Sequence, residues 1–331
     1  MGVEISKSLW WVVALFMVQV LQQIADGNQQ VHCHFIFGDS LADNGNNNFL
    51  DTLAKVNYSP YGIDYLYGPT GRFTNGRATI DVIAELLGFE NFIPSFATAY
   101  GTDILFGVNY ASGSAGIRNE TGSSERIPLE KPLENHQTTI LRLADILGTK
   151  WYYNTSQECT LEQFAQPLIQ QCAQQLMSLH DYGARKIALF GLGLIGCTPN
   201  AVEKYGTNGS ICVEIMEEAS LLFNKKLKSV VEELNSNLTD AKFIYINYYA
   251  VGADSSLLDF KDTSSGCCTV ASDGQCIANQ IPCKNRTEYA FWDSFHPTEA
   301  VNKFIAESSY SALEPSDAYP FDIHNLVLLN L

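Results

Sequence analysis

Three residues in two short motifs have the types and the order that acyl transfer to a serine requires. Ser40 lies in the sequence Phe-Gly-Asp-Ser-Leu, just after the apolar run 34–37, and Asp293 and His296 lie in Trp-Asp-Ser-Phe-His-Pro near the other end of the chain. A serine hydroxyl becomes a nucleophile when a histidine takes its proton, and a carboxylate on the second ring nitrogen fixes the histidine tautomer. The two motifs together therefore indicate a hydrolase that forms an acyl-enzyme. Taken singly, the first could be a capped turn and the second a buried structural histidine.

The elements that must position these residues alternate between apolar strands and amphipathic helices. Strands are predicted at 34–37, 106–110, 186–190 and 243–247, and helices at 79–87, 137–147, 161–180, 213–234 and 299–308. This alternation favours a parallel sheet with helices on both faces. Ser40 then follows the carboxyl end of a strand, where such sheets place their chemistry. Thr298 is expected to cap the helix that follows His296, and Pro167 lies inside a predicted helix, at a cost of about 3 kcal/mol unless that helix bends or begins late.

The two motifs and several further segments resemble the plant GDSL esterase/lipases of the SGNH hydrolase superfamily. The further segments lie at 71–77, 108–113, 183–186, 191–197 and 266–268, and the resemblance covers nearly everything from about residue 33 onward. It implies an α/β protein with a three-layer α/β/α fold, a mostly parallel central sheet, and hydrolysis of small-molecule or lipid carboxylic esters in the cell wall or apoplast. By the resemblance, Ser40 is the nucleophile, His296 the base and Asp293 its partner. The backbone N–H groups of Ser40 and Gly113 form the oxyanion hole, and no cofactor or metal is needed.

The chain departs from the pattern of that superfamily at one place. The superfamily has a strand that ends in Gly-x-Asn-Asp and whose first asparagine donates to the oxyanion, and no such block follows Gly113. We interpret this as an internal deletion near 149–151 and expect the sheet to be one strand short. Loss of one oxyanion donor costs about a hundred- to a thousandfold in rate. Two alternatives remain open: a catalytically impaired splice form of an enzyme, and a non-catalytic secreted relative that binds an ester or glycan or fails to fold.

Composition limits the remaining possibilities. The chain has 331 residues, 46% of them hydrophobic, and no internal repeat or linker, so residues 28–331 are predicted to form one domain. The net charge of −16 argues against binding of nucleic acid through a basic face. Residues 1–27 contain Lys7, an apolar run at 9–21 and small residues at the end, which is typical of a secretory signal peptide and too short for a stable membrane span. The sequence does not indicate an oligomeric state.

Cysteines and glycosylation motifs agree with a secretory route. Nine cysteines in an oxidising compartment predict disulfides and at least one free thiol. Four cysteines cluster before Asp293, namely Cys267, Cys268, Cys276 and Cys283, and bridges among them would brace the loop with the acid and base. Cys197 and Cys212 could close a second loop. Zinc is the alternative for the cluster, but the ligand spacing does not fit. Candidate glycosylation sites are Asn57, Asn119, Asn154, Asn208, Asn237 and Asn285.

The segment 191–196 fits the pattern G-x-G-x-x-G and follows a predicted strand, as in dinucleotide-binding proteins. Against that interpretation, the next helical stripe begins only near Val213, and no second strand ends in an acidic residue about twenty positions on. A tight crossing from strand to loop is the better prediction. The chain also lacks G-x-S-x-G, so the nucleophile elbow of α/β-hydrolases is excluded.

Overall fold

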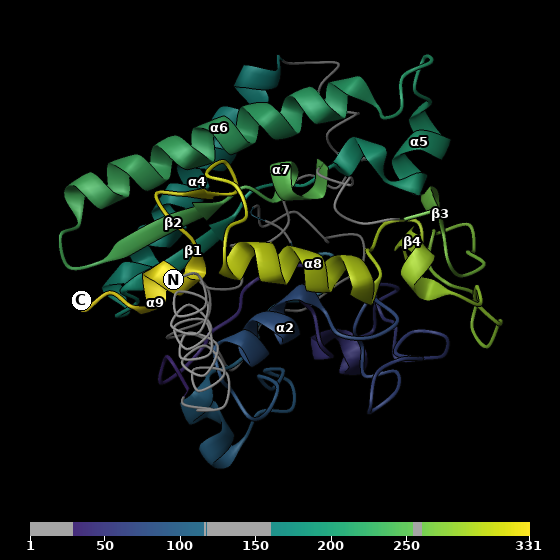
Figure 1. Cartoon of the computed structure of the whole chain (residues 1–331), viewed down its shortest axis with the longest axis horizontal. Coiled ribbons are helices and arrows are strands. Elements are labelled where there is room, and N and C mark those ends of the chain that lie inside the picture. The colour runs from purple at the N-terminus through teal and green to yellow at the C-terminus, as the bar shows by residue number, and fades with distance from the viewer. Residues whose placement is uncertain (1–28, 116, 118–159, 254–259) are drawn as a thin grey trace, which may run out of the picture.

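The structure is a computed structural model that describes residues 29–115, 117, 160–253 and 260–331 (Figure 1). The predicted signal peptide, the predicted helix 137–147 and the predicted junction at 149–151 lie outside the described residues. So do the sequons at Asn119 and Asn154.

A small sheet forms the centre of the molecule. Strand β1 (Lys186–Phe190) pairs in parallel with β2 (Lys242–Ile246), and β2 pairs antiparallel with the short β5 (Ala318–Tyr319). Both long strands lie where the apolar runs predict them. Successive side chains of a strand point to opposite faces, and here both faces are apolar, so the sheet must be covered on both sides.

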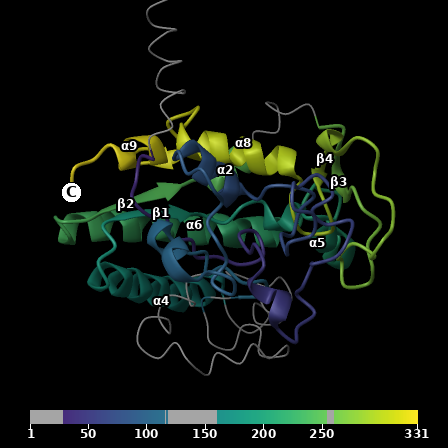
Figure 2. The same cartoon turned by 90° about the horizontal axis from the view of Figure 1, so that it is seen from below.

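Helices cover the two faces as two separate layers (Figure 2). On one face, α4 (Leu161–Asp181) and α6 (Glu214–Asn237) share a core with Ile187, Phe243 and Tyr245. On the other, α2 (Thr79–Leu86), α8 (Glu299–Tyr310) and α9 (Ile323–Val327) share a core with Ile244 and Ile246. The alternation along β2 therefore divides the core around the sheet into two, and the protein is an α/β protein with three layers.

A second parallel unit lies before Ser40. The N–H groups of His34 and Ile36 donate to the carbonyls of Phe106 and Val108 at 2.9 and 3.1 Å, and the Tyr110 N–H donates back to Ile36 at 2.8 Å. These are the predicted strands 34–37 and 106–110. They form isolated bridges rather than continuous strands, but they still fix the direction in which the chain reaches Ser40.

A large cavity adjoins both parallel units. Its volume is about 2520 Å³, and its lining includes residues 34–37 of the second parallel unit, all of β1, and the residues Ser40 and His296. Within the described part of the chain, β1 pairs on one edge only, with β2. The cavity thus borders the free edge of β1 as well as the nucleophile.

Several short elements complete the fold, and sequence periodicity did not find them. They are α5 (Pro199–Tyr205), α7 (Tyr248–Ala253), β3 (Asp262–Gly266), β4 (Tyr289–Phe291), and the 3₁₀ turns η1 (Asn46–Phe49), η2 (Gly101–Phe106), η4 (Ile195–Cys197) and η6 (Arg286–Glu288). Strands β3 and β4 pair in parallel. Helix α5 begins with Thr198 as its cap and proline at its first position, a recognised start signal. Helix α4 continues through Pro167.

Candidate active site

Ser40 lies on a tight turn directly after the segment 34–38. The backbone carbonyl of Asp39 accepts hydrogen bonds from the N–H groups of Ala42 and Asp43, and the Asp39 carboxylate accepts one from Leu41 at 2.9 Å. These bonds close the turn and hold the serine hydroxyl at the end of the parallel unit. Among the described residues, no acceptor is found for the Ser40 backbone N–H.

The structure brings Ser40, Asp293 and His296 together. His296 Nε2 lies 2.8 Å from Ser40 Oγ, and His296 Nδ1 lies 2.9 and 2.8 Å from Asp293 Oδ1 and Oδ2. Both ring nitrogens are thus within hydrogen-bond distance of the groups that a serine nucleophile and its orienting carboxylate would supply. The Asp293 side chain is fully buried and His296 is 7% exposed.

A local turn fixes the acid and the base relative to each other. Asp293 Oδ1 accepts hydrogen bonds from the backbone N–H groups of Phe295 and His296, each at 2.8 Å, and the Trp292 N–H donates to the His296 carbonyl at 2.7 Å. An aspartate that binds the backbone two and three residues ahead forms an Asx-type turn. The three-residue spacing is therefore used by the backbone as well as by the imidazole.

The segment 74–77 holds the loop of His296 from the side. Thr74 Oγ1 donates to the carbonyl of Pro297 at 3.0 Å, the Glu299 N–H donates to Asn75 Oδ1 at 2.8 Å, and Arg77 pairs with Glu299 at 2.5 Å. Helices α2 and α8 continue this contact side by side (Figure 1). The motif at 71–77, which the sequence marked only by resemblance, thus connects the base to the layer of α2.

The capping role expected of Thr298 is not observed. Thr298 is the residue before α8, but its hydroxyl donates to the Tyr289 carbonyl at 2.8 Å and makes no cap hydrogen bond. A hydroxyl turned toward β4 ties the start of α8 to the strand before Asp293. The Glu299 N–H in the first turn is satisfied by Asn75 instead.

The oxyanion donor expected at Gly113 is already paired. The Gly113 N–H donates to Asp43 Oδ2 at 2.9 Å, while Asp43 Oδ1 accepts from Gly45 and Asn46 at 2.8 Å each. In this structure the Gly113 N–H is thus paired with a carboxylate, and its expected role as an oxyanion donor stays a prediction. The following residue, Ser114, has a positive φ of 64° and lines the cavity together with Ser40.

Two carboxyl groups lie close to the serine in the chain, the half-buried Asp39 and the buried Asp43. Burial raises the pKa of Asp39, although the Leu41 N–H and the nearby His296 oppose that rise. Burial likewise raises the pKa of Asp43 to about 6, against the lowering effect of its backbone donors. Sequence reasoning assigned neither carboxylate a place in the site, because nothing in a Gly-Asp-Ser-Leu run shows which acids become buried.

Glycines of the segment 191–196 make close contacts with the protein itself. A Cβ at Gly191 would lie 2.6 Å from the Tyr245 hydroxyl, and one at Gly193 would lie 2.5 Å from the ring of Tyr248. The pattern is thus explained by the loop after β1, which passes close to Tyr245 of β2 and Tyr248 of α7. In the described part of the chain, no cluster of three or more His, Cys, Asp or Glu could hold a metal ion.

Within the residues that the structure describes, three disulfides form, two of them beside Asp293 and His296. Cys267 pairs with Cys283 and Cys268 with Cys276, and the third bridge, Cys197–Cys212, closes the loop that contains α5. The predicted disulfides are confirmed, including the pair Cys197–Cys212, and the structure adds the pairing within the cluster of four, which the sequence left open. Cys33 is free and exposed, and Cys172 is free and buried.

Comparison with known proteins then gives the family. The family model described as GDSL-like Lipase/Acylhydrolase matches residues 35–309. The chain belongs to this family. It is 44% identical to the Arabidopsis thaliana protein named GDSL esterase/lipase At1g29660, over 91% of this chain and 92% of that protein. It is also 44% identical to GDSL esterase/lipase At1g29670 and 43% identical to GDSL esterase/lipase At5g45670, both of Arabidopsis thaliana, with at least 96% of each chain covered. The resemblance drawn from the motifs is confirmed, and the protein is a hydrolase of carboxylic esters.

The alignments are longer than the matched part of this GDSL hydrolase. The first runs over 337 residues, whereas 91% of a 331-residue chain is about 301 residues, so about 36 aligned positions have no residue here. The second, over 358 residues, exceeds the whole chain. The relatives therefore contain residues that this chain lacks.

Proposed function

We propose that the protein is a serine esterase that cleaves carboxylic esters through an acyl-enzyme. Ser40 attacks the ester carbonyl while His296 takes its proton, and the same proton then passes to the leaving alcohol. Asp293 holds the imidazole and stabilises its charge, after which water releases the acyl group by the same base. The observation that carries this proposal is the chain of contacts Asp293–His296–Ser40, with 2.8 Å at each end. The Ser40 N–H is the backbone donor available to the developing oxyanion.

The cavity beside Ser40 supports an ester with an apolar acyl part. Its lining near the nucleophile includes Leu41, Leu53, Phe73 and Phe295. Apolar walls bind a hydrocarbon chain and keep bulk water from the acyl-enzyme except at the open side. Lipid or small-molecule esters are accordingly the proposed substrates.

Secretion is part of the proposal and is supported by the surface. The four described sequon asparagines, Asn57, Asn208, Asn237 and Asn285, are all exposed, as attachment of a glycan requires. Three disulfides suit an oxidising compartment. Within the described residues, no helix is both long and apolar enough to cross a membrane.

A second candidate is an impaired form of the same enzyme. The alignments show residues missing from this chain, a large cavity borders the free edge of β1, and the Gly113 N–H is bound to Asp43. We infer that the missing residues include a central strand with one oxyanion donor, near 149–151. Loss of that donor alone should lower turnover by about a hundred- to a thousandfold.

The test compares four purified forms made in a eukaryotic secretory host: this chain, a form with the relatives' extra block inserted between Lys150 and Trp151, and the Ser40→Ala variant of each. Hydrolysis of p-nitrophenyl butyrate is measured, with circular dichroism as the folding control and glycosidase digestion to detect glycans. We expect weak turnover by this chain and a turnover by the restored form that is higher by about a hundredfold or more. Neither form should turn over after Ser40→Ala. Activity that survives Ser40→Ala would contradict the proposed nucleophile. Equal rates for the first two forms would contradict the proposed lesion.

A further inference from the structure

A buried tyrosine contacts the carboxylate that orients His296. Tyr61 is fully buried, and its hydroxyl lies 2.7 Å from Asp293 Oδ2, the oxygen that also faces the imidazole. Its ring is held edge-on between Tyr58 and Phe73, with centroids 5.4 and 6.4 Å away. No mechanism step described above uses this residue.

The direction of the Tyr61 hydrogen bond is fixed by a second contact. The backbone N–H of Cys276 donates to Tyr61 Oη at 3.0 Å, which leaves the hydroxyl proton free to point at Asp293. Burial and the negative charge of Asp293 raise the pKa of Tyr61 far above its ordinary value, so the hydroxyl stays protonated. Tyr61 is therefore the donor in its contact with the Asp293 carboxylate.

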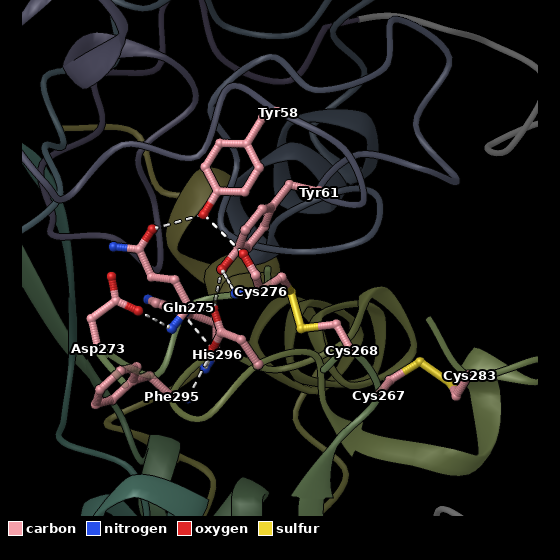
Figure 3. Close-up of a disulfide and its surroundings, with 11 residues drawn as sticks. Tyr58, Tyr61, Cys267, Cys268, Asp273, Gln275, Cys276, Cys283, Phe295 and His296 are labelled. Carbon is pink, nitrogen blue, oxygen red and sulfur yellow. Dashed lines mark hydrogen bonds and ion pairs between the residues drawn. A yellow bond between two sulfur atoms is a disulfide. The ribbon is translucent and has the colours of Figure 1, made fainter. Parts of the chain in front are cut away.

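The disulfide Cys268–Cys276 closes these contacts into a ring. Cys276 holds Tyr61, the disulfide joins Cys276 to Cys268, and the Cys268 N–H donates to the carbonyl of Trp292 at 3.0 Å, one residue before Asp293. Figure 3 shows Tyr61 above Cys276, with the disulfide to Cys268 on one side and His296 below. Two contacts thus hold Asp293 to this loop: Tyr61 binds its side chain, and Cys268 binds the backbone carbonyl of the residue before it.

Resting on the proposed function, we propose that Tyr61 is a positioning residue for Asp293 and that the Cys268–Cys276 loop holds Tyr61 in place. The carboxylate has two oxygens to orient. The Asx-type turn fixes Oδ1 through two backbone N–H groups, and Tyr61 is the one described group besides the imidazole that binds Oδ2. Without it, Oδ2 would be held only by the ring that it is meant to orient.

Tyr58 supplies a matched control. Its hydroxyl contacts the same loop, at the Gln275 side chain (3.2 Å) and the Cys276 carbonyl (3.1 Å), and Figure 3 shows it beside Tyr61. It has no hydrogen bond to Asp293 in the structure. Tyr58→Phe therefore removes a loop contact of the same kind and leaves the acid untouched, whereas Tyr61→Phe keeps the ring and removes only the donor.

The first measurement is steady-state hydrolysis of p-nitrophenyl butyrate by the restored form, in which turnover is measurable. A hydrogen bond to a charged group is strong enough that its loss should lower kcat of Tyr61→Phe by about tenfold, with KM within about twofold. Tyr58→Phe should keep kcat within about twofold. The double variant Cys268→Ser/Cys276→Ser should lose kcat in the same direction as Tyr61→Phe, because the donor to Tyr61 is no longer held. An unchanged kcat in Tyr61→Phe, or an equal loss in Tyr58→Phe, would overturn the proposal.

The second measurement does not depend on turnover. The proton between His296 Nδ1 and Asp293 is followed by ¹H NMR as a far-downfield resonance in this chain and in both phenylalanine variants. We expect it to shift in Tyr61→Phe and to stay in place in Tyr58→Phe. If the resonance is missing from the unaltered chain and from the restored form, the Ser-His-Asp assignment fails. If it is present but identical in Tyr61→Phe, only the positioning role fails.

Discussion

Replacing Asp293 by asparagine should leave the residues of the site in place but abolish most of the esterase turnover. Asp293 Oδ1 accepts two backbone N–H groups, from Phe295 and His296, so an amide NH₂ group at that position would face two donors. The amide therefore places its oxygen there, where it keeps both backbone hydrogen bonds, and its NH₂ group at the position of Oδ2, where it loses the single hydrogen bond that Tyr61 donates. That NH₂ group then donates to His296 Nδ1, which forces the ring proton onto Nε2.

The wrong tautomer removes the base. With a proton on Nε2, His296 can no longer accept the proton of Ser40, although the 2.8 Å contact between them persists. In a serine protease the same error costs about 10⁴ in kcat, which corresponds to about 5.5 kcal/mol of activation free energy. We expect a loss of that order for Asp293→Asn, and a small change in KM because substrate contacts are untouched.

The assay is hydrolysis of a fluorogenic butyrate ester by the restored form, with Ser40→Ala as the zero and thermal unfolding as the folding control. The expected result is a kcat for Asp293→Asn far below that of the restored form, in a variant that thermal unfolding shows to be folded. If Asp293→Asn keeps more than a tenth of the activity, the orienting role of this carboxylate is refuted, since Asp293 is the one group among the described residues that contacts His296 Nδ1.

Two further predictions concern stability. Arg72 and Asp81 form a buried bidentate ion pair, with both nitrogen–oxygen distances 2.7 Å. Arg72→Ala leaves the Asp81 charge buried without its partner and should lower the free energy of unfolding by about 3–5 kcal/mol. Urea titration measures this change, and a loss under about 1 kcal/mol would contradict the prediction. Asp43 has a pKa of about 6 when folded and an ordinary value of 3.8, so the folded state binds the extra proton and stability should fall as pH rises from about 4 through 6. Asparagine does not titrate, so Asp43→Asn should flatten the decline of the free energy of unfolding with pH. Urea titrations across this pH range measure that slope, and an identical slope in both proteins would count against the prediction.

The sequence predicted the elements with strong periodicity well. β1 occupies the predicted residues, and α2, α4, α6 and α8 begin within one residue of their predicted starts. Each of these elements buries one stripe or one face, so its apolar residues repeat about every 3.6 residues in a helix and about every 2 residues in a strand. The short elements α5, α7 and α9 have too few turns to show such a period, although Thr198 with the following proline was a readable start signal for α5.

The site was predictable where chemistry restricts residue type and unpredictable where packing decides. Ser40 and His296 stand out because few residues can act as nucleophile and base. Tyr61 gave no signal, since a buried tyrosine in an ordinary segment looks the same whether or not it meets a carboxylate 232 positions away. The pairing of Gly113 with Asp43 was missed for the same reason: a hydrogen bond between distant loops leaves no trace in local spacing.

The distance along the chain between the nucleophile and the base has a consequence for biosynthesis. His296 follows Ser40 by 256 residues, so on the ribosome the serine emerges long before the group that would activate it. The contact between Ser40 and His296 can form only after α8, which follows His296 directly, has packed on α2. A chain cut short before His296 therefore lacks the base that the proposed mechanism requires, and we expect it to be inactive.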